Sequence, residues 1–156
     1  MQSARLFFLA VFTMFMVTSC SGICNDNLSG SSMAAPSEDT VPMAAVGNVL
    51  KDIQFPFDSS TLTPAAKASL KTSAEWLNAN PRRTVIIEGH CDERGTVEYN
   101  LVLGEKRARA VYDYLRGLGV DAKRMSTISY GKEFPLDPAS NEAAWAKNRR
   151  AHLAVK

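Results

Sequence analysis

The sequence has few cysteines and almost no excess of charge of one sign. Eighteen Lys and Arg against 16 Asp and Glu leave a net charge of +2 in 156 residues, too small for a typical nucleic-acid-binding domain. Three cysteines are too few for a disulfide-dense fold. A 46% hydrophobic share excludes disorder throughout, and 9 Gly with 7 Pro exclude a collagen-like chain. The length predicts one folded domain.

Catalytic motifs are also missing. The sequence contains no Gly-x-Ser-x-Gly, no Walker loop and no Gly-x-Gly-x-x-Gly. Cys91 follows His90, but neighbours on a strand point to opposite faces, whereas a catalytic dyad must converge. His90, Cys91, Asp92 and Glu93 are consecutive, which is not the spacing of zinc ligands. We interpret His152 as structural. We therefore predict neither an enzyme nor a metal or cofactor.

No apolar run is long enough to span a membrane. The longest, Leu6–Val17, has 12 residues, whereas a spanning helix needs about 20. It follows Arg5 and is typical of a secretory signal; a retained anchor helix is the alternative. Val17-Thr18-Ser19-Cys20 resembles the bacterial lipobox, in which the cysteine is acylated. This predicts a signal peptide over 1–19 and lipidation at Cys20. Ser21, in place of Asp, favours the outer membrane.

Residues 20–48 are predicted to be a lipidated, flexible tether. Ten of the 28 residues after Cys20 are Gly, Ser or Pro, with no apolar periodicity to support a core. Cys24 is a weaker lipidation candidate, because Ile23 stands where a small residue is expected. Cys24 and Cys91 could pair, but the sequence does not require it, and we interpret Cys91 as free and partly buried.

Residues 49–156 alternate strand and helix patterns and are predicted to form the folded domain. Thr63-Pro64 is typical of a helix start, the β-branched run at Thr84–Glu88 indicates a buried strand, and Pro56 indicates an edge strand or a bulge. We predict a two-layer α/β domain, a small mixed sheet of about four strands covered by two long helices and a short one. We expect strands over Ile53–Phe57, Thr84–Glu88, Met125–Tyr130 and Arg150–Val155, and helices over Pro64–Asn78, Val97–Leu118 and Asn141–Lys147.

An arginine stands in line with the apolar stripe of the second long helix. Asn100, Leu103 and Arg107 share one face, and the stripe is expected to continue through Ala110, Val111, Tyr114 and Leu118. A buried guanidinium needs an anion. It could pair with Asp92 or Glu88. Alternatively, Arg107 and Asp92 form two walls of a pocket for a zwitterion, its carboxylate on the arginine and its ammonium on the aspartate.

Motifs in a fixed order carry a family resemblance. They include Phe57-Asp58, the loop from Gly89 to Thr96, Tyr99-Asn100-Leu101, Ser129-Tyr130-Gly131 and Trp145-Ala146-Lys147-Asn148-Arg149-Arg150. Together they resemble the OmpA C-terminal-like family, and among its members the lipoproteins of the Tol envelope system. The resemblance implies a non-enzymatic domain that binds peptidoglycan and links the outer membrane to the cell wall.

The resemblance also assigns roles to residues. It implies that Asp92 accepts the ammonium of diaminopimelate in the stem peptide, that Arg107 holds its carboxylate, and that Phe57, Asp58 and Asn100 line the same pocket. Further wall residues are expected at Leu103 and Arg94. For Arg149 and Arg150, a structural role and a ligand contact stay open. Pro56 departs from the family pattern, which places the backbone path beside Phe57 in question.

The implied partners are peptidoglycan, the outer membrane through the N-terminal lipid, and Tol-system proteins such as TolA and TolB, with a role in envelope integrity and cell division. Nucleic acid is not among them. The main alternative is a periplasmic protein-interaction module that uses the same pocket for a partner's loop. An enzyme acting on the wall, such as an amidase, is a more distant one.

Overall fold

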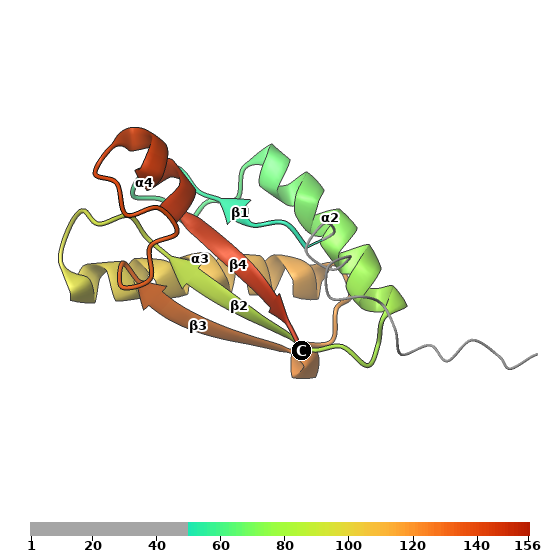
Figure 1. Ribbon diagram of the computed structural model, residues 1–156. Helices are drawn as coiled ribbons and strands as arrows, with labels where there is room; N and C mark the ends of the chain where they lie inside the picture. Colours follow the sequence, from blue (N-terminus) through green and yellow to red (C-terminus); the bar gives the residue numbers. More distant parts are fainter. Residues whose placement is uncertain (1–49) are drawn as a thin grey trace, which may run out of the picture. The chain divides into compact units, whose positions relative to one another are not determined.

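A computed structural model describes residues 50–156 of the chain (Figure 1). The predicted signal peptide, the tether and Cys20 lie outside the described residues. Within them, four strands form one sheet in the order β1-β4-β2-β3. The strands are β1 (Ile53–Gln54), β2 (Val85–His90), β3 (Met125–Gly131) and β4 (Arg150–Val155); the helices are α2 (Pro64–Ala79), α3 (Val97–Gly117), α4 (Glu142–Asn148) and the short 3-10 helix η1 (Ala122–Arg124).

The sheet is mixed, as predicted. Strand β4 is antiparallel to both β1 and β2, whereas β2 and β3 are parallel and joined through α3. The two long helices and one short helix also agree with the prediction, so the two-layer α/β fold class is confirmed.

Local sequence signals explain where the long helices begin. The Thr63 hydroxyl accepts a hydrogen bond from the Ala66 N–H at 3.1 Å, and Pro64 occupies the first turn of α2. The Thr96 hydroxyl caps α3 in the same way, accepting from the Tyr99 N–H at 3.2 Å. Helix α3 ends at Gly117 with Leu118 as its C-cap, and Gly119 follows with a φ of +89°, a conformation that favours glycine.

Strand β1 is shorter than predicted. The pattern of Ile53–Phe57 suggested a five-residue strand, but the strand stops at Gln54. Pro56 has no N–H to donate to a neighbouring strand. The last backbone hydrogen bond between this segment and the start of β4 runs from the Phe55 N–H to the Arg149 carbonyl at 2.9 Å. The chain then turns at Asp58, the only described non-glycine residue with a positive φ.

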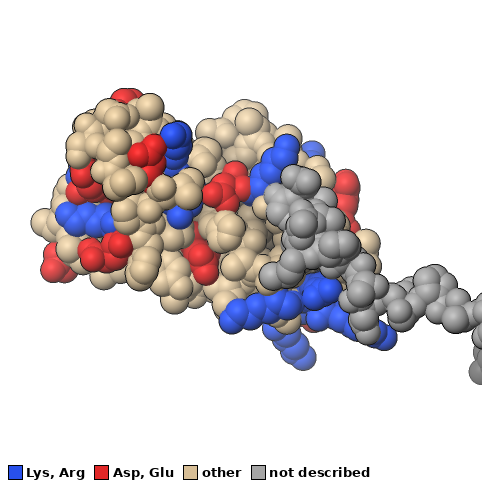
Figure 2. Space-filling view, viewed as in Figure 1, with Lys and Arg blue, Asp and Glu red and all other residues tan. Residues whose placement is uncertain are grey.

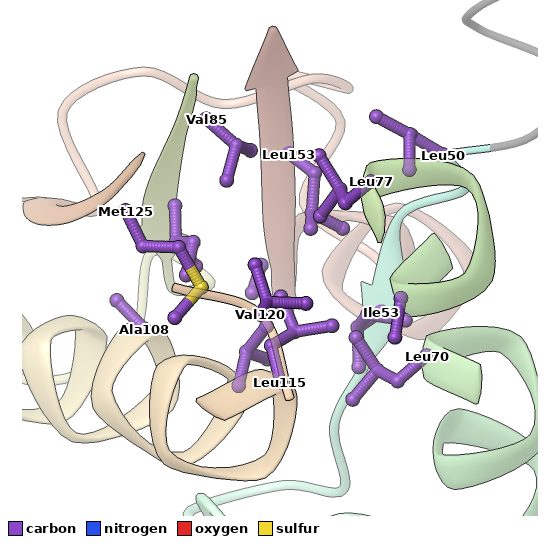
Figure 3. Close-up of a cluster of buried hydrophobic side chains, with 14 of the residues drawn as sticks. Leu50, Ile53, Leu70, Leu77, Val85, Ala108, Leu115, Val120, Met125 and Leu153 are labelled. Atoms are coloured by element: carbon purple, nitrogen blue, oxygen red, sulfur yellow. The ribbon is translucent and has the colours of Figure 1, made fainter. Parts of the chain in front are cut away.

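The core lies between the sheet and one layer formed by α2 and α3 (Figure 3). The prediction for the α3 stripe holds in part: Val111 is fully buried, and Tyr114 and Leu118 are partly buried and pack against the core. The other fully buried positions after Arg107 are Ala108 and Leu115, which the prediction did not include, and Ala110 is half-buried. The core is made of the following buried side chains of the described chain, so residues 50–156 contain a complete hydrophobic core: Leu50, Ile53, Phe55, Ala66, Leu70, Ala74, Leu77, Val85, Ile87, Ala108, Val111, Leu115, Val120, Met125, Ala151 and Leu153.

Strand register gives the domain two distinct ends. Val85 is level with Met125 and with Val155, so the starts of β2 and β3 lie beside the end of β4. At the opposite end, β2 runs into the Cys91–Thr96 loop that leads to α3. The two ends are separated by the length of β2, six residues or about 20 Å.

Candidate functional site

A cleft of about 500 Å³, counted with its open mouth, lies at the end of β2 where the chain turns into α3. The segment after β1, the loop after β2 and the first half of α3 line it. All seven predicted site residues are among its lining residues, which are Phe57, Asp58, Cys91, Asp92, Arg94, Gly95, Tyr99, Asn100, Leu103 and Arg107. Three segments far apart in the sequence therefore meet at one site.

Arg107 is buried without a carboxylate partner among the described residues. Its side chain is 1% exposed. Nε donates to the Ser59 carbonyl at 2.9 Å, Nη1 to the His90 carbonyl at 2.8 Å and to Cys91 Sγ at 3.3 Å, and Nη2 to the Pro56 carbonyl at 3.2 Å. Burial lowers the pKa of Arg107, although the nearby Cys91 and Asp92 favour its charge.

This geometry speaks against the interpretation of Arg107 as the partner of a nearby carboxylate. Neither Asp92 nor Glu88 forms an ion pair with it in residues 50–156. Carbonyl oxygens accept three hydrogen bonds from the guanidinium but leave its charge without a counter-anion. The cleft therefore holds a fixed positive charge in a desolvated place, which is the arrangement expected of an anion-binding wall.

Asp92, 4% exposed, is held by two arginines. Its Oδ1 accepts from the Arg94 backbone N–H at 3.2 Å and from Arg94 Nε at 3.3 Å. Its Oδ2 accepts from Arg94 Nη2 at 2.6 Å and from Arg149 Nη1 at 3.3 Å. Burial alone would raise the pKa of Asp92, but the hydrogen bonds from Arg94 and Arg149 outweigh it and lower this pKa. The Asp92 carboxyl is thus ionised near neutral pH.

Arg94 stands over Asp92 between two aromatic rings. Its guanidinium carbon lies 4.1 Å from the centre of the Phe57 ring and 4.2 Å from that of Trp145. The side chain is 34% exposed, so it sits at the mouth of the cleft and not in its floor. Such stacking positions a cation while leaving it in contact with water.

The structure separates the roles of Arg149 and Arg150, which the sequence left open. Arg149 is buried and bonds Asp92, and its Nη2 donates to Glu142 Oε1 at 2.7 Å. It does not line the cleft itself and acts as a support for Asp92. Arg150 lies on the other face of the sheet, with its Nε 3.4 Å from Asp52 Oδ2.

Asn100 ties the loop after β2 to the start of α3. Its amide nitrogen donates to the Arg94 carbonyl at 2.8 Å and to the Thr96 carbonyl at 2.9 Å. Tyr99, exposed on the same turn, donates from its hydroxyl to Asp58 Oδ1, which raises the pKa of Tyr99. The loop and the segment after β1 are thereby held together across the cleft.

Sequence reasoning did not select three of the lining residues: Cys91, Gly95 and Tyr99. The adjacency of Tyr99 to Asn100 was a usable signal, because both stand in the first turn of the helix that lines the cleft. Cys91 is a free, buried cysteine whose Sγ lies 3.4 Å from the Asn100 carbonyl. His90 instead lines a hollow on the opposite face of the sheet, with Glu88 and Tyr130, so the two residues do not converge.

No helix within residues 50–156 is long and apolar enough to cross a membrane. No three His, Cys, Asp or Glu side chains in the same range are grouped so that they could hold a metal ion.

Comparison with known proteins identifies the family. The model of the OmpA family matches residues 54–149, which is more than half of the chain. The chain belongs to the OmpA family. The matched segment runs from β1 to the residue before β4, and therefore contains every residue of the cleft.

Individual relatives within the OmpA family share much of the sequence. The chain is 43% identical to the peptidoglycan-associated lipoprotein of Agrobacterium fabrum over 124 residues, 80% of this chain and 68% of the relative. It is 41% identical to that of Haemophilus influenzae over 138 residues, 88% of this chain and 89% of the relative. The crystal structure of the peptidoglycan-associated lipoprotein from Burkholderia pseudomallei superposes with a TM-score of 0.66 at 44% identity, covering 68% of this chain and 90% of that one.

These relatives confirm the resemblance to lipoproteins of the OmpA family that the motifs indicated. They carry the name of a peptidoglycan-associated lipoprotein and not of an enzyme, which agrees with the prediction that the chain is not an enzyme.

Proposed function

We propose that this chain is an outer-membrane lipoprotein whose periplasmic domain binds peptidoglycan non-covalently through the diaminopimelate of the stem peptide. The names of its OmpA-family relatives support the association with peptidoglycan. The observation that carries the choice of ligand is the buried Arg107, which lacks a carboxylate partner and lies in one cleft with the ionised Asp92. A ligand with one carboxylate and one ammonium on the same carbon, as in diaminopimelate, matches this pair of charges.

Arg107 can accept a carboxylate without losing its bonds to the backbone. A guanidinium has five N–H groups, and three of them hold the carbonyls of Pro56, Ser59 and His90. A fourth contacts only Cys91 Sγ, a weak acceptor, and one N–H on Nη2 has no acceptor among the described residues. One N–H on each of Nη1 and Nη2 is thus available for a bidentate bond to a carboxylate.

Asp92 has to exchange a bond to receive an ammonium. Its two oxygens already accept four hydrogen bonds, three from Arg94 and one from Arg149, which fills the lone-pair positions of a carboxylate. Arg94 is the more exposed of the two arginines, so the ligand ammonium would displace part of its contact. Arg94 could then move within the space between Phe57 and Trp145 and remain part of the wall.

The expected affinity is modest. Three or four charge-assisted hydrogen bonds contribute about 1.5–3 kcal/mol each. Association costs roughly 4–15 kcal/mol in lost freedom, and the exchange at Asp92 reduces the gain further. Micromolar or weaker binding per site follows, and many copies held at one wall would add avidity.

The anchoring and the partners complete the proposal. Lipidation at Cys20 would hold the chain in the outer membrane facing the periplasm, with the cleft on the cell wall. Contacts with Tol-system proteins such as TolA and TolB, and a role in cell division, rest on the family resemblance.

The proposal is tested by calorimetry on residues 21–156, which retain the complete core but lack the lipidation site. The titrants are a muropeptide with diaminopimelate and one with lysine at that position, which keeps the ammonium but lacks the second carboxylate. We expect the lysine form to bind at least about tenfold more weakly, because Arg107 loses its anion. Equal binding of the two forms would contradict the assignment of Arg107.

Asp92→Asn tests the other wall. This variant keeps the size of the side chain and removes the charge that would receive the ammonium, so we expect it to abolish binding of the diaminopimelate form. Asp113→Asn, which changes an exposed carboxylate on α3, is the matched control and should bind like the unchanged chain. If none of these proteins binds either muropeptide, the alternative of a protein-interaction module gains support.

A further inference from the structure

The end of the domain opposite the cleft carries a concentration of positive charge. Arg82 and Arg83 precede β2, Lys123 and Arg124 precede β3, and Lys156 follows β4. The register of Val85 with Met125 and Val155 places these three segments side by side. Figure 2 shows Lys and Arg side chains gathered at this end, near the C-terminus marked in Figure 1.

The first described residues add to the same end. Strand β1 is antiparallel to β4, with Ile53 level with Ala151, so the residues before Ile53 run alongside the end of β4. Lys51 therefore joins the group, which we call the basic end: Lys51, Arg82, Arg83, Lys123, Arg124 and Lys156.

Few acids oppose this charge. The segments that form the basic end contain two, Asp52 and Asp121. Asp52 accepts from His152 Nδ1 at 2.7 Å and lies 3.4 Å from Arg150 Nε, on the face of the sheet that the long helices do not cover. Asp121 caps η1 by accepting from the Lys123 N–H. Counted over side chains, six cations against two carboxylates leave an excess of four positive charges.

A role in stabilising the fold explains the position of only some residues of the basic end. Arg124 donates to the carbonyls of Leu77, Asn80 and Arg83 and so closes the turn after α2. Arg83 is half-buried, whereas Lys51, Arg82, Lys123 and Lys156 are exposed. Fold stability does not require the exposed lysines Lys51, Lys123 and Lys156 to converge from three separate segments, since like charges repel.

We propose that the basic end is a docking surface for a bilayer that carries anionic phospholipid headgroups. The occupant follows from where the described chain begins, because Leu50 lies at this end and the predicted lipidation site at Cys20 lies only about 30 residues earlier in the sequence. Those residues can span at most roughly 100 Å, so a lipid at Cys20 would keep the basic end within that distance of the membrane surface.

Charge complementarity supports the same occupant. A cation near an anionic lipid surface strengthens binding by about fivefold, and a lipid chain needs such a second signal for stable anchoring. The cleft lies at the far end of β2, about 20 Å away, so a domain seated through its basic end would present the cleft away from the membrane.

This inference takes the lipid anchor from the proposed function, but its test does not involve the cleft. Residues 21–156, without lipid, are sedimented with vesicles of phosphatidylcholine alone and of phosphatidylcholine mixed with phosphatidylglycerol, at low salt. We expect binding to the anionic vesicles only, and its loss at about 1 M salt, where the Debye length falls to about 3 Å. Soluble glycerophosphate should not compete, because the surface recognises an array of charges and not one phosphate.

A fourfold variant, Lys51→Gln, Arg82→Gln, Lys123→Gln and Lys156→Gln, removes the exposed cations of the basic end. We expect its binding to anionic vesicles to weaken by about 25-fold or more, the effect of at least two cations. The matched control changes four exposed cations on the outer sides of α2 and α3, Lys67→Gln, Lys71→Gln, Lys106→Gln and Arg109→Gln, with the same change in net charge. It should retain most of the binding.

Three outcomes would overturn the inference. The first is that the unchanged chain does not sediment with anionic vesicles. The second is that the two fourfold variants lose binding equally, which would indicate that net charge matters and that binding is not located at the basic end. Competition by glycerophosphate would instead indicate a site for a single phosphate. Muropeptide binding by the variant of the basic end should stay unchanged, so the result is independent of the cleft.

Discussion

Arg107 has two roles in this structure, and its replacement by alanine separates them. Beside its place in the cleft, the guanidinium holds the carbonyls of Pro56 and Ser59, after β1, and of His90, at the end of β2. Arg107→Ala removes all three contacts at once. We therefore expect this variant to be less stable as well as defective in binding.

The expected loss of stability can be worked from these bonds. A hydrogen bond from a charged donor contributes about 1.5–3 kcal/mol, so three of them stabilise the fold by roughly 4–9 kcal/mol. The burial that lowers the pKa of Arg107 opposes this, because taking a cation out of water costs several kcal/mol. We expect Arg107→Ala to lower the free energy of unfolding by about 2–4 kcal/mol.

Urea unfolding of residues 21–156, followed by circular dichroism, measures the effect. Arg109→Ala is the matched control, since Arg109 lies on the exposed side of the same helix, where it pairs with Asp113 at 3.2 Å and stacks on the Tyr112 ring at 4.7 Å from its centre. The control should change the free energy of unfolding by less than about 0.5 kcal/mol. If Arg107→Ala unfolds at the same urea concentration as the unchanged chain, the guanidinium does not hold the segment after β1 against the end of β2, and the structural role assigned to Arg107 is wrong.

Three further predictions concern the sheet. Burial, with the charges of Arg150 and His152, lowers the pKa of His90 to about 4, so the free energy of unfolding should fall by up to about 3 kcal/mol as the pH falls from 6.5 to 4. Urea unfolding at several pH values measures this, and His90→Gln should remove the pH dependence. If the variant shows the same pH dependence as the unchanged chain, His90 is not its cause. The hydrogen bond to Asp52 raises the pKa of His152. The contribution of this pair to the stability of the fold is therefore complete below about pH 6.5 and is lost as the pH rises through the raised pKa. In an NMR titration, Asp52→Asn should lower the pKa of His152, and an unchanged pKa would exclude Asp52 as the cause. A Cβ on Gly89 would lie 1.9 Å from the Gly104 carbonyl oxygen, so Gly89→Ala should lower the free energy of unfolding by more than about 3 kcal/mol. Gly117 has open space around it, so Gly117→Ala should leave the melting temperature unchanged or raise it. Equal melting temperatures of the two variants in thermal unfolding would contradict the contact between β2 and α3.

Most of the fold could be predicted from local patterns. Thr63-Pro64 and Thr96 mark helix starts because a side-chain oxygen there satisfies a free backbone N–H, whatever the rest of the chain does. The β-branched residues before Gly89 indicate a buried strand for the same local reason. The error at β1 was also local, since Pro56 already showed that a ladder could not continue through it.

The buried face of α3 was harder to predict. Its spacing indicated Ala110, Val111, Tyr114 and Leu118, and Val111 is indeed fully buried. The other fully buried positions are Ala108 and Leu115, whereas Tyr114 and Leu118 only flank the core. The close approach of Gly104 to Gly89 fixes the rotation of the helix, and this contact joins two segments 15 residues apart. Helical periodicity gives the width of a stripe, but its exact centre depends on the partner against which it packs.

For the cleft, the sequence by itself determined which residues are present and, through the family motifs, which seven belong together. Only the tertiary structure decided their partners. Arg107 is held by carbonyls from the segment after β1 and from the end of β2, and Asp92 is bonded by Arg94 and by Arg149, which lies 57 residues later. Composition and periodicity report what a residue does within its own element. The acceptor that a buried charge finds depends on which distant backbone the packing brings beside it, because in the desolvated interior the nearest polar atom replaces water.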